Sequence, residues 1–251
     1  MKEWIIGRNP VYEVLRARRR QVFRLLLAEG VQKSDRLDEI MRLALDRKIA
    51  IERVPRQRLD SLGENPQGVA LQASAFSYAA FADVIELAKK RGEDLFVLVL
   101  DLIQNPQNLG TLLRTAEAAG VQGVILPLRQ AALVTPAVVS ASSGASEHML
   151  IVQSNLAQAI SALKETGAWI VGLEGSPAAR LPGEIGLDGP LALVVGNEGE
   201  GMRPLIRQSC DLLMRLPMRG QVDSLNAAVA GSIAIYLVLQ ARARAAKGTP
   251  A

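Results

Sequence analysis

The stretch Leu212–Gln240, LLMRLPMRGQVDSLNAAVAGSIAIYLVLQ, organises the chain because it joins a polar loop to a helix that is apolar on every face. From about Ser224 the pattern predicts this helix, and a helix apolar all round must be buried on all sides. Ser224 and Asn226 lie at its first turn, where unpaired backbone N–H groups and positive potential can hold a ligand. Ser224 or Asp223 could equally be no more than the helix cap. We expect a buried, dimer-forming helix whose amino-terminal end belongs to an active site.

Composition indicates a soluble globular protein. The chain has 251 residues, of which 49% are hydrophobic and 22% charged, so disorder is not expected. No apolar run approaches the roughly 20 residues that a membrane span needs. The start, MKEWIIGRNP, lacks the apolar core of a signal peptide. We therefore expect a cytoplasmic location and no membrane partner.

Cysteine and histidine are nearly absent, which limits the chemistry. One cysteine, Cys210, allows no internal disulfide or cysteine metal cluster, and its apolar neighbours favour a buried, inert thiol. One histidine, His148, leaves little room for a Ser-His-Asp triad or a multi-histidine metal site. We expect no metal, and chemistry carried by Arg, Glu, Ser, Asn and the backbone.

Basic residues are concentrated in the first third of the chain. Residues 1–74 carry 15 Lys and Arg against 10 Asp and Glu, whereas the remaining residues carry 14 against 15. Such asymmetry favours an anionic partner, most simply nucleic acid, although cations also complement a helix carboxyl end. The candidate RNA-binding residues are Arg8, Arg18, Arg19 and Arg20.

The order of predicted elements indicates two α/β domains. Residues 1–76 read as a small α/β domain, and residues 77–93 as a helical linker. From residue 94 to 246, apolar strands alternate with helices in the rhythm of a parallel sheet. In such sheets ligands bind outside the carboxyl ends of the strands.

Three polar loops fit that position. The first holds Asn108 and Arg114, and the guanidinium could grip a phosphate or pair with a structural carboxylate. The second, Val194–Met202, is rich in glycine, and its Glu198 and Glu200 favour a nucleoside with a cationic group over a nucleotide. The third is Leu216–Asn226.

Together the three loops resemble the SpoU (TrmH) branch of the SPOUT class, RNA ribose 2′-O-methyltransferases that use S-adenosylmethionine. The matching segments are NPQNLGTLLRTAEAAGV, LALVVGNEGEGM and LPMRGQVDSLNAAVAGSIAIY. The first third, with GRNPVYEVL and QGVAL, is similar to the RNA substrate-binding domain of the rRNA guanosine 2′-O-methyltransferases of this family. The resemblance implies a parallel-sheet catalytic domain with a deep carboxyl-terminal trefoil knot, and a homodimer packed through the knot region and last helix.

The resemblance also implies site residues. The positions that match the family's catalytic set are Asn108, Arg114, Glu198, Ser224 and Asn226. Those that match its cofactor site are Gly196, Gly201, Leu216, Met218 and Leu225. Two departures are Ala-Ala-Val-Ala after Ser-Leu-Asn, where Val-Ser-Val-Ala is common, and Pro66 in place of the usual His before Gln-Gly-Val. Pro66 bears on the choice of RNA site rather than on the chemistry.

The function implied is S-adenosylmethionine-dependent methylation of a ribose 2′-hydroxyl in RNA, with a guanosine of large-subunit (23S) rRNA as the expected target. We expect Arg114 to stabilise developing negative charge, since a protonated guanidinium is no base. Two alternatives stay open: a 2′-O-methyltransferase acting on tRNA or another rRNA site, and a non-catalytic RNA-binding assembly factor on the same fold.

Overall fold

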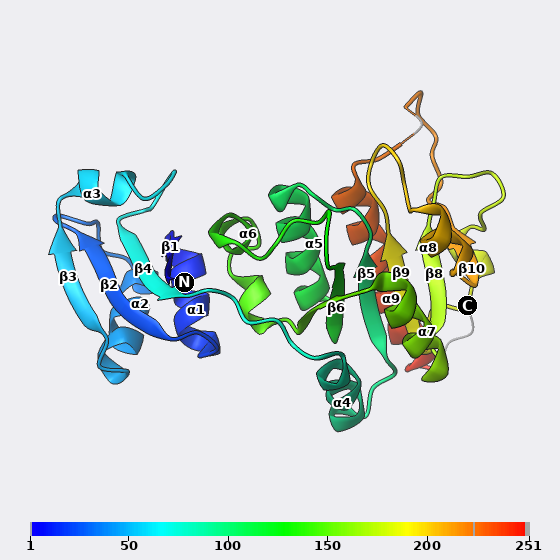
Figure 1. Ribbon diagram of the computed structural model, residues 1–251, viewed down its shortest axis with the longest axis horizontal. Helices are drawn as coiled ribbons and strands as arrows, with labels where there is room; N and C mark the ends of the chain where they lie inside the picture. Colours follow the sequence, from blue (N-terminus) through cyan, green and yellow to red (C-terminus); the bar gives the residue numbers. More distant parts are fainter. Residues whose placement is uncertain (1, 223, 249–251) are drawn as a thin grey trace. The chain divides into compact units, whose positions relative to one another are not determined.

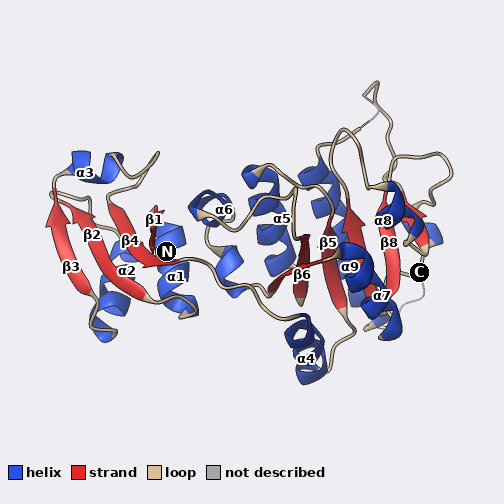
Figure 2. Cartoon of the chain, in the orientation of Figure 1, coloured by secondary structure: helices blue, strands red, loops and turns tan. Residues whose placement is uncertain are grey.

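The computed structural model describes residues 2–222 and 224–248, so the candidate cap Asp223 lies outside the described residues. The chain forms two compact units. The first comprises the described residues up to Ser77 together with Leu133–His148, and the second comprises Tyr78–Ala132 and the described residues from Met149 onward. Figure 1 shows the sequence order of the elements, and Figure 2 shows the strands of each sheet.

The first unit contains a mixed four-stranded sheet in the order β1-β4-β2-β3. The strand β4 is antiparallel to both β1 and β2, whereas β2 and β3 are parallel. The strands are β1 (Lys2–Ile6), β2 (Val22–Ala28), β3 (Ala50–Val54) and β4 (Val69–Ser74), and the helices are α1 (Arg8–Ala17), α2 (Asp35–Asp46), α3 (Arg56–Asp60), α6 (Pro136–Ala141) and the 3-10 turn η1 (Ala145–His148). The small α/β architecture agrees with the sequence, although β1 was not predicted. The Ser34 side chain caps α2 by accepting a bond from Leu37 N–H.

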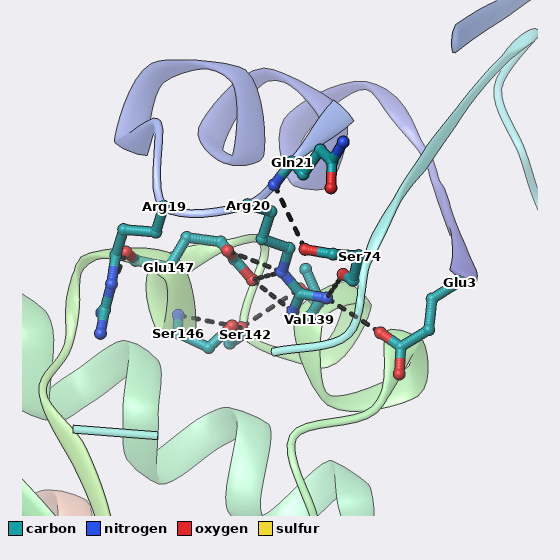
Figure 3. Close-up of polar contacts among 9 residues, drawn as sticks. All are labelled: Glu3, Arg19, Arg20, Gln21, Ser74, Val139, Ser142, Ser146 and Glu147. Atoms are coloured by element: carbon teal, nitrogen blue, oxygen red, sulfur yellow. Dashed lines mark hydrogen bonds and ion pairs between the residues drawn. The ribbon is translucent and has the colours of Figure 1, made fainter. Parts of the chain in front are cut away.

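A buried ion-pair cluster lies inside the first unit (Figure 3). Arg20 is 3% exposed and Glu147 is fully buried. The guanidinium donates from Nε and Nη2 to the Glu147 carboxylate at 3.0 and 2.8 Å, and from Nη1 to Glu3 Oε2 at 2.9 Å. A further bond reaches the Ser74 carbonyl at 3.0 Å. Because Glu147 belongs to the segment Leu133–His148, this cluster ties that segment to the amino-terminal sheet.

The second unit is built on a six-stranded sheet, parallel throughout as predicted, in the order β10-β8-β9-β5-β6-β7. The chain builds outward from β5 through β6 to β7, then crosses to the other side of β5. That reversal places a topological switch at β5 and β9, where open parallel sheets bind ligands. The strands are β5 (Phe96–Leu100), β6 (Gly123–Pro127), β7 (Ile151–Ser154), β8 (Trp169–Leu173), β9 (Leu191–Val195) and β10 (Leu212–Met214).

Helices cover both faces of this sheet. One face packs on α4 (Phe81–Arg91), α7 (Leu156–Glu165) and α8 (Pro204–Gln208), which share a core with the alternate strand residues Val97, Val99, Ala192 and Val194. The other face carries α9 (Ala227–Ala245), which packs against β9 and against α5 (Pro106–Ala118). The short turn η2 (Pro182–Glu184) lies between β8 and β9.

The predicted linker is part of this core. Its helix, α4, buries Val84 and Ala88, and a side chain at Gly123 would come within 2.5 Å of a Val84 methyl group. We expected residues 77–93 to connect two domains. Residues 78–93 lie in the second unit, whereas Ser77 and the segment Leu133–His148, which was expected in the second domain, lie in the first. The sequence predicted the helix α4 itself, but it did not indicate which elements the helix packs against.

The last helix is buried on one side. Its buried residues face α5 and β9, whereas Val229, Ile233 and Tyr236 are exposed at a spacing of three to four residues. The elements of one chain therefore leave one side of the helix uncovered, and its burial by a second copy stays a prediction. Its cap is Asn226, whose Oδ1 accepts from Ala228 N–H and Val229 N–H.

Within residues 2–222 and 224–248, no helix is both long enough and apolar enough to cross a membrane.

Candidate active site

A cavity of about 470 Å³ opens at the carboxyl ends of β8 and β9. Its wall combines the ends of these strands, the glycine-rich loop after β9, the loop after β10 and the first turn of α9. All five residues expected to hold a cofactor line it: Gly196, Gly201, Leu216, Met218 and Leu225. These residues come from the second and third of the polar loops, which the fold brings together at the strand ends.

The glycine-rich loop is a tight hairpin. Asn197 and Gly201 exchange two backbone hydrogen bonds, both 3.0 Å long, and the Asn197 side chain accepts from Gly199 N–H at 2.9 Å. A Cβ atom on Gly196 would lie 2.4 Å from the Gly201 carbonyl carbon, so no larger residue fits there. Gly201 has a φ of 69°, which also favours glycine. The loop therefore has one shape and exposes backbone to the cavity.

Both ends of this loop are fixed to the end of β5. The fully buried Asp101 accepts from Arg203 N–H at 2.8 Å and from Arg203 Nε at 2.8 Å. On the other side, Asn197 Nδ2 donates to the Leu102 carbonyl at 3.2 Å. Charge-assisted bonds of this kind are short and strong, so they hold the cavity wall in register with the sheet.

Three of the five predicted catalytic residues contact one another. Asn108 lies in the first turn of α5, Glu198 in the glycine-rich loop and Asn226 at the cap of α9. Asn226 Nδ2 donates to Glu198 Oε1 and, at 3.2 Å, to Asn108 Oδ1. Asn108 Nδ2 lies 3.5 Å from Glu198 Oε1, which also accepts from Ala227 N–H at 3.2 Å. One carboxylate thus joins the glycine-rich loop to the starts of two helices.

The other two catalytic candidates are placed differently. Ser224 lines the cavity beside Leu225. Arg114 is exposed on α5, about 9 Å along the axis from Asn108 at the usual helical rise. It is not among the residues that line the cavity.

The sequence analysis missed an ion pair in the cavity wall. Glu174, directly after β8, accepts from Arg207 Nε at 2.6 Å and from Arg207 Nη2 at 3.0 Å, and these bonds raise the pKa of Arg207. With Glu198 and Glu200, the wall carries three carboxylates and one paired guanidinium. Its position after a strand could have identified Glu174, because it obeys the same rule as the three loops.

The RNA-binding candidates of the first unit divide into two groups. Arg20 cannot contact RNA as predicted, because its guanidinium is buried and bonded to Glu147, Glu3 and Ser74. The Arg8 guanidinium bonds Gln67, Ser34 and Gln32, so it ties three segments of the unit together. Arg18 and Arg19 are exposed, although Arg19 Nη1 also donates to the Glu147 carbonyl at 3.4 Å, and their contact with RNA stays a prediction.

The cysteine and the histidine lie apart from this chemistry. Burial raises the pKa of the Cys210 thiol to about 12, which keeps it protonated as expected for an inert group. His148 lies in the first unit, at the end of η1, where Nε2 is 2.7 Å from Glu13 Oε2. In the described part of the chain, no group of three or more His, Cys, Asp or Glu side chains is placed to hold a metal ion.

Comparison with known families matches both parts of the chain. Residues 95–236 match the SpoU rRNA Methylase family, and residues 4–79 match the family model described as RNA 2′-O ribose methyltransferase substrate binding. The Bacillus subtilis protein YacO, assigned to the TrmH family of tRNA/rRNA methyltransferases, is 39% identical over 245 residues, with 96% of each chain covered. A Staphylococcus aureus relative assigned to the same family is 40% identical over 240 residues, covering 95% of this chain and 96% of the relative.

Solved structures share the fold. The SpoU methyltransferase AviRb from Streptomyces viridochromogenes, solved in complex with AdoMet, superposes with a TM-score of 0.77 at 23% identity, covering 96% of this chain and 91% of that one. An rRNA methyltransferase from Sinorhizobium meliloti, also bound to AdoMet, gives 0.76 at 22% identity, with 95% and 87% covered. An RNA 2′-O ribose methyltransferase gives 0.77 at 25% identity, with 96% and 89% covered.

Proposed function

This chain belongs to the SpoU rRNA methylase family, and from that premise we propose that it methylates a ribose 2′-hydroxyl of large-subunit (23S) rRNA, at a guanosine, using S-adenosylmethionine. The observation that carries the proposal is the cavity at the carboxyl ends of β8 and β9, with Asn108, Glu198 and Asn226 joined beside it. Relatives with this fold were crystallised with AdoMet, which supports the choice of cofactor.

The cavity suits a cationic nucleoside. Gly196 gives it a backbone wall with no room for a side chain, which a flat ligand can approach closely. Three carboxylates line it, and the guanidinium among its lining side chains, Arg207, is already paired with Glu174. Opposite charges favour one another at short range, so a sulfonium fits this wall better than a phosphate does. S-adenosylmethionine supplies the electrophilic methyl group.

The side chains around the cavity have different roles in positioning the substrate and stabilising charge. Glu198 holds Asn226 and Ala227 N–H, so it fixes the start of α9 against the glycine-rich loop. Asn108 and Ser224 then orient the ribose. Arg114 stabilises negative charge on the 2′-oxygen or on the adjoining phosphate, and a substrate phosphate or water accepts the proton. Positioning supplies much of the acceleration, because an in-line displacement needs its atoms aligned.

A homodimer would complete this arrangement. The exposed residues Val229, Ile233 and Tyr236 form one apolar stripe on α9, as a helix buried by a second copy requires. Arg114, exposed on the neighbouring helix α5, would then reach the cavity of the partner subunit or of its own. The trefoil knot implied by the resemblance stays a prediction, as does the assignment of Arg18 and Arg19 to RNA contacts.

The test is transfer of labelled methyl from S-adenosylmethionine to unmodified large-subunit rRNA, small-subunit rRNA and tRNA, followed by mapping of the modified ribose. Label on one guanosine of large-subunit rRNA is the expected result. Label on tRNA or small-subunit rRNA would keep the chemistry and overturn the substrate. No label on any RNA, with RNA binding intact, would overturn the enzymatic function in favour of an assembly factor.

A further inference from the structure

A second cavity, of about 680 Å³, opens at the same edge of the six-stranded sheet. It lies where β6 and β7 end, and its residues come from the loop after β6, the start of α7 and the start of α8. None of the residues predicted from the sequence to be functional lines it. The same strand-end rule that identifies the first cavity therefore points to a second binding site.

The helix α8 separates the two cavities. Leu205 and Ile206 line the second cavity, whereas the next residue, Arg207, lines the first. Just before the helix, Met202 lines the first cavity and Arg203 the second. A ligand that extends past α8 would therefore meet both sites.

The two cavities have opposite charge. Glu174, Glu198 and Glu200 line the first, whereas the second contains Arg129 and Arg203, with no Asp or Glu among its lining residues from the described ranges. Of these two cations, Arg203 is bonded to the buried Asp101, which neutralises much of its charge. The net positive potential of the second cavity thus rests on Arg129.

The Arg129 guanidinium has no hydrogen bond or ion pair with any residue among 2–222 and 224–248. It is exposed in the loop that leaves β6. An unpaired guanidinium presents five donors in a rigid fork that matches the oxygens of a phosphate. Its neighbours Gln130, Ser154 and Asn155 add neutral polar groups suited to a sugar or a base edge.

Apolar side chains complete the site. Leu128 is 64% exposed and Leu205 is 62% exposed, and both line the cavity above the buried Leu156 and Ile206. Exposed leucines beside an arginine suit a ligand with a flat apolar face and an anionic group. A nucleotide of a single-stranded RNA has both, since its base can be splayed out against side chains while its phosphate meets a cation.

We propose that this second cavity binds a nucleotide that flanks the acceptor nucleotide in the RNA substrate, with its phosphodiester on Arg129 and its base against Leu128 and Leu205. The proposal rests on the proposed function, because it takes RNA as the substrate of the first cavity. It assigns to the catalytic unit a contact with the strand that is separate from the basic first unit. The strand would run across α8 from one cavity to the other.

The test compares Arg129→Gln with Arg91→Gln in the full-length protein. Arg91 is exposed at the end of α4, just before β5 begins, so the control removes the same charge at the opposite edge of the sheet. Arg129→Gln should raise the KM for RNA and the Kd of RNA about tenfold, leaving kcat at saturating RNA and the affinity for S-adenosylmethionine unchanged. In a plot of the logarithm of the RNA-binding constant against the logarithm of the salt concentration, the magnitude of the slope should also fall by about 0.7, the value for one single-strand phosphate contact.

A second pair of variants tests the apolar wall. Leu205→Glu should weaken RNA binding more than Leu205→Gln, because the added carboxylate repels the phosphodiester while the two side chains have similar size. Equal effects of the two variants would contradict an anionic ligand.

The outcomes separate this inference from the proposed function. Wild-type protein that methylates no RNA overturns the function. If the wild type is active but Arg129→Gln and Arg91→Gln have the same KM, Kd and salt dependence, only the proposal for the second cavity is overturned. A loss of S-adenosylmethionine affinity in Arg129→Gln would also overturn that proposal. If an isolated nucleoside monophosphate binds as tightly as an RNA oligonucleotide, and this binding depends on Arg129, the proposal is also overturned. The ligand of the second cavity would then be a free nucleotide rather than a flanking nucleotide of the RNA.

Discussion

The two units of this protein use carboxylates in opposite ways. In the first, Glu147 is fully buried and its oxygens are saturated by the equally buried Arg20. In the second, Glu198 is exposed at the edge of a cavity, and its partners are the neutral Asn226, Asn108 and a backbone N–H. The buried carboxylate pairs with a buried guanidinium that it shares with Glu3, whereas the exposed one keeps its charge beside a space that a ligand can enter.

This difference explains why charge in the sequence was a poor guide to function in the first third. Arg18, Arg19 and Arg20 are consecutive and chemically alike, but only the first two are exposed. A buried charge is retained because it is paired and bonded, and removing one partner costs far more than the pair contributes. The following experiments test the distinction between structural and functional charge, in order of decreasing expected effect.

The largest effect should follow Glu147→Gln. It leaves the Arg20 guanidinium buried without its main counter-charge, so the free energy of unfolding should fall by about 3–5 kcal/mol. The control is Glu39→Gln, since Glu39 pairs with Arg36 on the surface of α2 and such a pair contributes about 0–1 kcal/mol. Urea denaturation measures both. An equal fall in the free energy of unfolding of the two variants would show that the buried cluster stabilises the fold no more than a surface ion pair does.

Arg114→Ala should come next, acting on catalysis rather than folding. Removing a group that stabilises transition-state charge lowers turnover about 10²–10³-fold, or about 2.7–4 kcal/mol. The affinity for S-adenosylmethionine, measured by calorimetry, should stay within twofold because Arg114 does not line the cavity. Near-normal turnover would remove Arg114 from the catalytic set, and a parallel loss of stability would place it with the structural charges.

Gly196→Ala should weaken S-adenosylmethionine binding by about tenfold, or about 1.4 kcal/mol. The added Cβ would meet the Gly201 carbonyl carbon at 2.4 Å and displace the hairpin. Gly199→Ala is the matched control, because the nearest atom to its Cβ is an Asn197 side-chain oxygen at 3.8 Å. Calorimetric titration should find the control close to wild type. Similar losses in both variants would mean that the loop is adaptable rather than fixed.

The smallest effect concerns Cys210, whose thiol is ionisable but held neutral. Burial raises its pKa from 9.0 to about 12. The folded state therefore binds the proton more tightly than the unfolded state, and this contribution to stability is complete below pH 9 and is lost as pH rises toward 12. The free energy of unfolding, measured by urea denaturation, should therefore decline less between pH 8 and 10 in Cys210→Ala than in the wild type. An unchanged decline would mean that the thiol is not desolvated.

Sequence patterns predicted the parts of the site that depend on local chemistry. The strand-end rule placed the three loops at one edge of a parallel sheet. The five cofactor residues implied by the family resemblance line one cavity there. What the patterns missed are pairings across long separations. Glu147 lies 127 residues from Arg20, and nothing near either residue indicates the other. The same limit hid the packing of α4 and the exposed side of α9, since a helix pattern states which face is apolar and not what covers it.

The segment Leu133–His148 has a consequence for the order in which the protein can be made. The family match for the substrate-binding part ends at residue 79, but the unit that contains it is completed only at His148, because Glu147 supplies the carboxylate for Arg20. On a ribosome, the first 77 residues would emerge with Glu3 as a partner for Arg20 but without Glu147, the fully buried one. About 70 further residues, which include the strands β5 and β6 of the second unit's sheet, are made before Glu147 is available. The contact between Arg20 and Glu147 can therefore form only after residue 147 has been made, and a first unit truncated at residue 77 would lack it.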